Sequence, residues 1–296
     1  MELSTTSKIP WKMKTSSKKL EKVNTGISKK EIIATFNNNK NFVYLKEKKE
    51  RKQNIRDIPP EKLKEMLING DDDQIYFKNE EEYMEDQNQR FDYYEKDVMF
   101  MPTLTKEREL LYIFGPSGSG KSFLSKKYAI LYKKFKKGND VFVLSHVKND
   151  PSFEGMTYKH IPVEKKILEE IDLETLADSL VIFDDTDSRD KELQKMVDAL
   201  KDDIAQRGRH HNISAIYTTH MACNFFRTRV LLSECDKFIV FPGSGGKKQQ
   251  EYMVVNYGGM AKSFFNSLGS YRSRWMMFNV RYPNYVVHDH GVQLLS

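Results

Sequence analysis

The stretch GPSGSGKS, residues 115–122, decides how this chain folds. It fits the spacing GxxxxGKS of a phosphate-binding loop. The apolar run 110–114 before it predicts a buried strand, and apolar residues at helical spacing in 121–135 predict a helix after it. Strand, loop and helix in this order are the context that distinguishes a phosphate-binding loop from a flexible Gly/Ser linker.

A loop of this kind binds phosphate through its backbone. Glycines let the N–H groups turn inward, and the N-terminal end of the following helix adds a favourable field. Lys121 is expected to reach the β- and γ-phosphates of ATP, and Ser122 to bind Mg²⁺. The residues expected to hold the nucleotide are Gly115, Pro116, Ser117, Gly118, Ser119, Gly120, Lys121 and Ser122.

Length and composition predict a protein with a substantial core. The 296 residues, 39% of them hydrophobic, suffice for one large or two modest domains. No apolar run approaches the roughly 18 residues of a membrane span, and the N-terminus lacks the apolar core of a secretory signal. Only Cys223 and Cys235 are present, which excludes a disulfide scaffold. We therefore expect a soluble, intracellular protein.

Charge is distributed unevenly along the chain. Residues 1–66 carry 17 Lys/Arg and 8 Asp/Glu, residues 67–109 carry 5 and 13, and residues 241–296 carry 6 and 2. Basic ends favour nucleic acid through counterion release, although solvated Lys-rich faces are also common. This change in composition predicts an N-terminal extension over 1–100, basic and then acidic and partly disordered. The phosphate-binding loop places a P-loop ATPase domain over 101–296.

The N-terminal extension gives weaker local signals. Residues 1–55 are rich in Lys, Asn and Ser, and are expected to be poorly ordered with a short helix near 29–36. DIPPEKLKEMLING, residues 57–70, predicts a short amphipathic helix that begins near Pro60. The acidic and aromatic stretch 71–97 is expected to be a solvated connector or a lid.

From Leu110 onward, predicted strands alternate with predicted helices, which indicates an α/β fold with a mostly parallel central sheet flanked by helices. The tail around Pro283 predicts a closing pair of strands. The predicted strands are LYIF (111–114), DVFVLSH (140–146), TYKHI (157–161), SLVIFDD (179–185), ISAIYTTH (213–220) and KFIVF (237–241), and the predicted helices are 121–135, 164–171, 190–206 and 223–232.

A P-loop needs an acidic partner at the end of a buried strand, and SLVIFDD supplies two candidates. Asp184 is expected to hold Mg²⁺ through water, and Asp185 to orient the attacking water. The alternative is an exposed acidic helix cap, because DDTDSRD also resembles a turn that opens a helix. Asp187 and Asp190 are interpreted as capping residues.

Polar and basic residues surround the next predicted strand. Thr219 and His220 at its end are candidates to sense the γ-phosphate. Arg207 and Arg209 precede the strand, where an arginine can reach the phosphates of a neighbouring subunit and stabilise the charge that develops on hydrolysis. The alternative is a pair of surface arginines favoured by the helix dipole.

Two other patterns are weaker. His210, His211, His220 and Cys223 do not follow a known zinc spacing. PGSGGKKQQ, residues 242–250, follows the acidic strand, and is interpreted as a basic loop that contacts DNA phosphates or as a solvent-exposed hairpin.

Four motifs in this order, GPSGSGKS, LVIFDD, QRGRHHNISAIYTTH and KFIVFP, resemble the genome-packaging ATPases of large eukaryotic DNA viruses and virophages. This poxvirus-type family belongs to the FtsK/HerA superfamily, and the resemblance covers about residues 108–290. It implies phosphate and Mg²⁺ roles for Lys121 and Ser122, and a sensor role for His220, where a glutamine is usual in the superfamily. It also implies the acidic pair Asp184 and Asp185 and an arginine finger at Arg207 or Arg209.

The resemblance further implies a pentameric or hexameric ring that threads double-stranded DNA and works at a capsid vertex or portal, in the virion or the cytoplasmic virus factory. Two other classes share the P-loop. A nucleoside or small-molecule kinase would need a lid of arginines and a substrate pocket, and the long helix after the acidic strand favours a ring ATPase. A GTP-dependent switch would need an NKxD motif, which the sequence lacks.

Overall fold

The computed structural model describes nearly all of the last two thirds of the chain and shorter parts of the first third. The described residues are 2–6, 11–13, 20–22, 32–46, 53–54, 59, 61–62, 75–76, 90–93, 97–103, 107–271 and 273–295.

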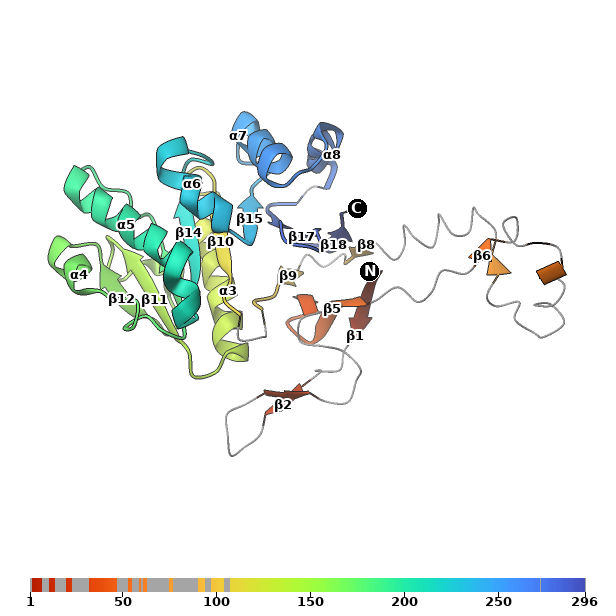
Figure 1. Cartoon of the computed structure of the whole chain (residues 1–296), viewed down its shortest axis with the longest axis horizontal. Coiled ribbons are helices and arrows are strands. Elements are labelled where there is room, and N and C mark those ends of the chain that lie inside the picture. Colours follow the sequence, from red (N-terminus) through yellow and green to blue (C-terminus); the bar gives the residue numbers. More distant parts are fainter. Residues whose placement is uncertain are drawn as a thin grey trace.

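A ten-stranded sheet forms the centre of the structure (Figure 1). The first six strands run parallel to one another, and the other four continue from the sixth in antiparallel pairs. The α/β class and the mostly parallel sheet predicted from the sequence are confirmed. From one edge to the other, the strands are β12 (Lys159–Pro162), β11 (Asp140–Ser145), β13 (Ser179–Phe183), β14 (Ser214–Thr219), β10 (Leu110–Phe114), β15 (Lys237–Val240), β16 (Met276–Asn279), β17 (Tyr285–His288), β18 (Gly291–Leu294) and β8 (Arg90–Asp92).

Helices cover both faces of this sheet because successive strand residues point to opposite sides. In β10, Leu111 and Ile113 pack in the core that contains α3, whereas Tyr112 and Phe114 pack in the core that contains α5 and α6. The helices are α3 (Lys121–Phe135), α4 (Lys165–Glu170), α5 (Lys191–Arg207), α6 (Phe225–Glu234), α7 (Lys247–Tyr252) and α8 (Lys262–Ser267), with 3-10 turns at Pro151–Phe153, Gly208–His211 and Leu268–Tyr271 and a π-helical turn at Met253–Tyr257.

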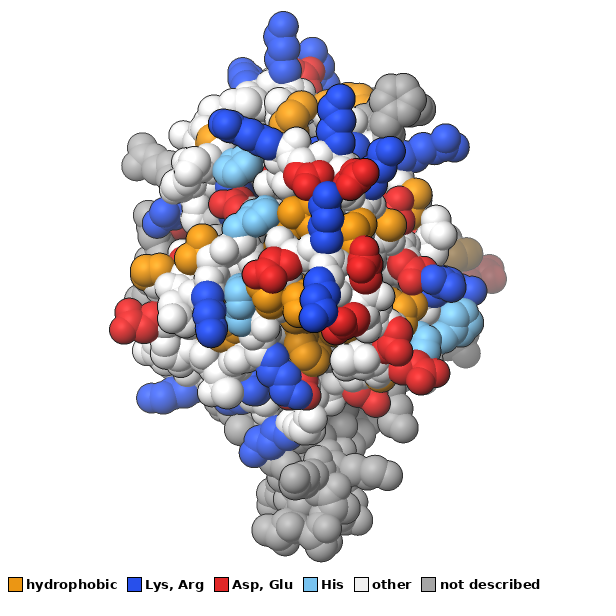
Figure 2. Space-filling view, turned by 90° about the vertical axis from the view of Figure 1, so that its left-hand side faces the viewer, with side chains coloured by type: hydrophobic (Ala, Val, Ile, Leu, Met, Phe, Trp, Pro, Cys, Tyr) orange, Lys and Arg blue, Asp and Glu red, His pale blue; other side chains and the backbone are white. Residues whose placement is uncertain are grey.

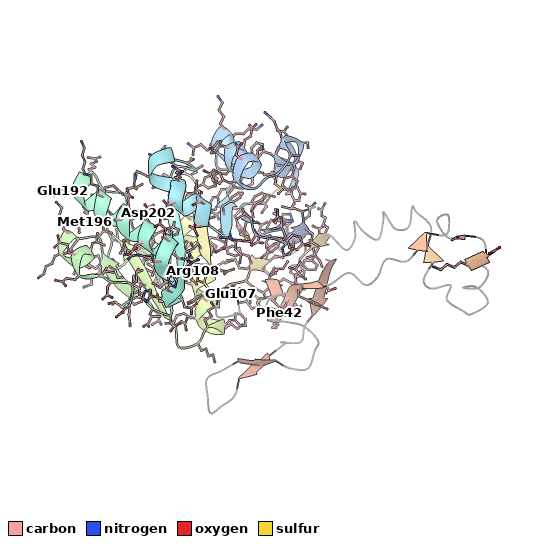
Figure 3. The ribbon with its side chains drawn as sticks, in the orientation of Figure 1. Phe42, Glu107, Arg108, Glu192, Met196 and Asp202 are labelled. Carbon is pink, nitrogen blue, oxygen red and sulfur yellow. The ribbon has the colours of Figure 1, made fainter. Side chains whose placement is uncertain are left out.

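A smaller sheet packs on the α3 side. Its order is β1 (Glu2–Thr6), β5 (Asn41–Lys46), β4 (Ile32–Phe36) and β9 (Met99–Phe100). Phe42 of β5 is fully buried, and its ring lies 6.3 Å from that of Phe135 in α3. Figure 3 shows Phe42 on the side of the molecule opposite Glu192 and Met196 of α5. Burial of one such phenylalanine stabilises the fold by about 1.5–3 kcal/mol, so this sheet is anchored to α3 and the main sheet.

The prediction of a short helix near residues 29–36 is wrong, because Ile32–Phe36 form strand β4. All five residues of β4 are buried, and β-branched and aromatic side chains fit such a position. Asn37, Asn38 and Asn39 follow with φ of 52°, 52° and 61°. Asparagine tolerates this left-handed region, so the three asparagines turn the chain into β5.

Other predictions for the extension fall partly outside the described residues. Of the helix predicted over 57–70, the structure describes Glu61 and Lys62 as helical. Most of the acidic stretch 71–97 also lies outside the described residues, but Arg90–Asp92 form β8 at the edge of the main sheet. Two small strand pairs complete the described elements: β2 (Trp11–Met13) with β3 (Leu20–Lys22), and β6 (Gln53–Asn54) with β7 (Ile75–Tyr76).

A buried ion pair lies at the start of β10 and β15 and also contacts the segment that follows β9. Glu109 precedes β10 and pairs with Lys237, the first residue of β15. The Tyr128 hydroxyl of α3 donates to the same carboxylate at 2.5 Å, and the Lys237 ammonium also donates to the Met101 carbonyl at 3.2 Å. Because buried charges need several partners, this cluster fixes β10, β15 and α3 relative to one another.

Candidate functional site

The P-loop turns sharply between β10 and α3. Gly120, at the N-cap of α3, has a φ of 108°, in the left-handed region that favours glycine. At Gly115 the reason for glycine is space, because a Cβ there would lie 2.9 Å from Ser119 Oγ. The loop exposes Pro116, Ser117 and Gly118 at the carboxyl edge of the sheet.

Lys121 begins α3 and its side chain folds back over the loop. Its Nζ donates to the carbonyls of Gly115 at 3.0 Å and Pro116 at 3.2 Å. Burial lowers the pKa of this ammonium, while Asp185 and Asp184 act in the opposite direction. The charge is therefore held at the loop, beside both carboxylates.

Asp184 follows β13 and is almost completely buried. Ser122 Oγ donates to its two carboxylate oxygens at 3.1 and 2.9 Å, and Thr218 Oγ1 donates at 3.1 Å. Burial raises the pKa of Asp184 to about 6, although the bonds from Ser122 and Thr218 favour the charged form. A hydroxyl and a carboxylate at this position are oxygen ligands that fit Mg²⁺.

His220 lies between the P-loop lysine and the second acidic residue. Its Nδ1 is 3.4 Å from Lys121 Nζ, and its Nε2 is 3.2 Å from Asp185 Oδ1. Asp185 has a φ of 44° and a largely exposed side chain. A neutral imidazole satisfies both contacts if Nδ1 accepts from Lys121 and Nε2–H donates to Asp185.

Thr218 is the threonine that faces Asp184 and Asp185, and it was not among the site residues predicted from the sequence. Thr219 instead bonds through its hydroxyl to the backbone of Met221, and does not contact Asp184. The alternation of side chains along β14 was the available signal, because consecutive threonines point to opposite faces. The structure thus brings together Lys121, Ser122, Asp184, Asp185 and His220.

Arg207 and Arg209 lie at the opposite edge of the sheet from the P-loop. Arg207 ends α5 and Arg209 lies in the turn after it, and both precede β14, a strand of six residues that spans about 20 Å. Arg207 pairs with Asp203 on the same helix, and Arg209 lies in the next turn. Arg108 caps this end of α5, donating to the Ile204 and Ala205 carbonyls at 2.6 and 2.7 Å. Neither arginine reaches the phosphate loop of its own chain.

The two aspartates interpreted as caps behave differently. Asp190 caps α5, accepting from the backbone N–H of Glu192 at 2.9 Å, as predicted. For Asp187 the prediction is wrong, because its carboxylate pairs with Arg227 of α6 at 2.8 Å. Arg227 also bonds Asp198 of α5 at 2.9 Å. It therefore ties the turn after the acidic pair to two helices, a contact between distant segments that the sequence pattern does not reveal.

A pocket of about 140 Å³ opens beside the P-loop. The Arg274 guanidinium borders it, and lies 3.5 Å from where a Cβ on Gly120 would be. The exposed ring of Phe123 contributes an apolar wall. The residues that line the pocket are Ser119, Gly120, Phe123, Leu124, Lys127, Phe241, Arg274, Trp275 and Asp289.

A glycine-rich loop between a buried strand and a helix, with an acidic residue at the end of a neighbouring parallel strand, defines a P-loop NTPase. No protein-family model matches the chain. The uncharacterized protein V3 of Sputnik virophage is 34% identical over 191 residues, which cover 64% of this chain and 78% of that protein. The chain therefore belongs to the family of this virophage protein, and the kinship with virophages indicated by the motifs is confirmed.

Two solved structures are also similar. B204, the DNA-packaging ATPase from Sulfolobus Turreted Icosahedral Virus, is 16% identical, with a TM-score of 0.42, over 60% of this chain and 94% of that chain. The pCW3 conjugation coupling protein TcpA, in its monomer form with ATPγS, is 13% identical, with a TM-score of 0.47, over 89% of this chain and 77% of that chain. Similarity at this level transfers neither an activity nor a partner.

Proposed function

We propose that this chain is an ATPase of the FtsK/HerA type that moves double-stranded DNA and packages a viral genome into a capsid. The observation that supports it best is the place of β14 between β10 and β13, which puts His220 between Lys121 and Asp185. Binding alone needs the lysine and the loop. The added exposed carboxylate, oriented by a histidine, suits activation of a water molecule.

Each residue has a distinct proposed role. Lys121 binds the β- and γ-phosphates, and Asp185 orients the attacking water and accepts its proton. His220 holds Asp185 and detects whether Lys121 is engaged by phosphate. An Mg²⁺ ion held by Ser122 and Asp184 would neutralise charge on the phosphates. Asp185→Asn should keep ATP binding while turnover stops, and normal turnover would refute the role of Asp185.

We further propose that Phe123 and Arg274 receive the nucleotide base. Phe123 is 54% exposed and lies on the first turn of α3, next to the loop expected to hold the phosphates. A planar base gains contact area by stacking on an aromatic ring or a guanidinium plane. Phe123→Ala should therefore raise the KM for ATP more than it lowers kcat, and Phe123→Tyr is the matched control.

The arginine finger requires a second copy of the chain. Because Arg207 and Arg209 lie about one strand length from their own P-loop, either can reach phosphate only across a subunit contact, as in a ring. A subunit with Arg207→Ala and Arg209→Ala should be inactive alone but recover part of its activity when mixed with Asp185→Asn subunits. Failure of every mixing ratio to restore turnover would refute the finger.

DNA is proposed to contact the segment 242–250. It follows β15 at the P-loop edge, and Lys247 and Lys248 begin α7 there. Gln249 accepts from the Ala222 N–H at 3.0 Å, which links this basic segment to the loop after His220. The face seen in Figure 2 instead mixes basic and acidic side chains. Lys247→Ala with Lys248→Ala should reduce stimulation by DNA and leave DNA-free turnover unchanged.

The deciding experiment measures ATP turnover by the purified chain with and without double-stranded DNA as the salt concentration rises. A translocase should be stimulated by DNA, and salt should abolish the stimulation because phosphate contacts release counterions. If turnover ignores DNA and responds to a nucleoside or another small acceptor, the chain is a kinase and the proposal is wrong. Docking to a capsid vertex or portal and a location in the virion or virus factory are parts of the same proposal.

A further inference from the structure

Three potential metal ligands meet at the turn between β17 and β18. His288 ends β17, and Asp289 and His290 form the turn. One ligand atom from each residue lies within 4.8 Å of the other two. Asp289 Oδ1 is 2.6 Å from His290 Nδ1, and the two imidazole rings are 4.5 Å apart. Among the residues that the structure describes, this is the one such group of three or more.

His288 has no satisfactory explanation as an ordinary core residue. Its side chain is buried, and neither ring nitrogen has a hydrogen-bond partner within the described part of the chain. A buried polar atom without a partner destabilises the folded chain. The ring is confined by the backbone of Gly291, where a Cβ would lie 2.7 Å from His288 Cε1, and by the Tyr271 ring.

We propose that His288, Asp289 and His290 bind one divalent transition-metal ion, with zinc as the ion that suits the ligands best. Two imidazoles and a carboxylate leave a fourth tetrahedral position for water. With metal–ligand distances of about 2.0–2.2 Å, the ligand atoms of a tetrahedral site lie roughly 3.5 Å apart. The wider separations in this group, up to 4.8 Å, must therefore shorten, and the 2.6 Å contact between Asp289 and His290 must lengthen. Rotation of the Asp289 and His290 side chains in the turn can provide this movement. The ion would give one of the two buried His288 nitrogens a partner.

The proposed ion has a structural role near the nucleotide pocket. Asp289 accepts from Ser273 Oγ at 2.8 Å and from the Arg274 N–H at 3.3 Å. The same turn is held by the Tyr93 N–H, which donates to the His290 carbonyl at 2.7 Å. A metal ion on Asp289 would therefore fix the backbone that directs Arg274 toward Gly120. This ion is separate from the Mg²⁺ proposed at Ser122 and Asp184.

The test titrates zinc into the full chain after treatment with a chelator and removal of that chelator, in excess Mg²⁺ to occupy the nucleotide site. Calorimetry should show one zinc ion per chain, and cobalt in place of zinc should show the visible absorption of a tetrahedral site. His290→Ala should weaken binding at least 10-fold. His210→Ala, which removes an exposed histidine remote from the turn, is the matched control and should bind normally.

Thermal unfolding gives a second readout that does not depend on ATP turnover. Zinc should raise the unfolding temperature of the wild-type chain and of His210→Ala, but not that of His290→Ala. His290→Gln removes the ligand with less change in volume, and serves if the alanine variant does not fold. Absence of zinc binding by the wild-type chain, or equal binding by the His290 variants, would overturn the proposal.

Discussion

Replacing Asp184 by asparagine should stabilise the fold while it abolishes turnover. The carboxylate is 3% exposed, and burial raises its pKa from 3.8 to about 6. At about 1.4 kcal/mol per pKa unit, keeping this group charged costs the folded chain about 3 kcal/mol above pH 6. Asparagine is neutral and nearly the same shape, and its Oδ1 still accepts from Ser122 and Thr218.

The stability that Asp184→Asn adds should decrease as the pH falls. Between pH 3.8 and about 6 the folded wild-type chain binds more protons than the unfolded chain, so its stability rises as the pH falls through this window. The advantage of the variant should therefore be about 3 kcal/mol at pH 8 and should approach zero near pH 4. Urea unfolding at both pH values, without nucleotide and with a chelator for Mg²⁺, measures it.

Asp185→Asn provides the control, because this neighbouring side chain is 58% exposed. Its stability should change by less than about 1 kcal/mol, although it also loses turnover. Two results would contradict this reasoning: Asp184→Asn lowers the free energy of unfolding at pH 8, or it raises that free energy equally at both pH values. Burial would then not disfavour the charged form of Asp184. The reasoning that burial raises the pKa of Asp184 would then be refuted.

Four further changes follow from the structure. Lys121→Ala should weaken ATP binding at least 10-fold in an equilibrium titration, because it removes the cation that reaches the phosphates. Arg274→Ala should raise the KM for ATP several-fold, and Arg274→Lys should restore little if a planar guanidinium is required. Tyr128→Phe should cost about 1–3 kcal/mol in urea unfolding by removing a buried hydrogen bond, whereas the exposed Tyr282→Phe should cost nothing measurable. His220→Gln should retain turnover that His220→Leu loses, and equal turnover by both would show that the side chain needs no polar atoms.

Local sequence could predict the residues of the site that follow directly from strand ends. The P-loop and the acidic pair each occupy a few consecutive positions after an apolar run, and the carboxyl ends of parallel strands meet at one edge of a sheet. Helix α3 has the bounds that the pattern predicted, Lys121–Phe135. Strand β14 was also predicted, but which of its two threonines faces Asp184 depends on the register of the strand. A one-residue shift of that register exchanges Thr218 and Thr219.

Other contacts could not be predicted because they join segments far apart in sequence. Arg274 reaches Gly120 only because β15 and β16 pair antiparallel and carry the chain back to the P-loop edge. Arg227 meets Asp187 across 40 residues through the packing of α6 on α5. The wrong prediction at β4 has a local cause. The sequence contains the three asparagines of the turn at Asn37–Asn39, but the residues before them also fit a short helical pattern.

The contacts of His220 explain how a histidine can occupy this position, where glutamine is usual in the superfamily that the sequence motifs resemble. A neutral imidazole offers one acceptor and one donor on opposite sides of the ring, and a glutamine amide offers an acceptor and a donor on one terminal group. Either can accept from Lys121 and donate to Asp185. In the proposed mechanism, phosphate would engage the Lys121 ammonium, and the acceptor of His220 would lose its donor while its bond to Asp185 remained. Asp185, the carboxylate proposed to orient water, is thereby connected through His220 to Lys121, the lysine proposed to bind the γ-phosphate. This connection requires β14 to lie between β10 and β13.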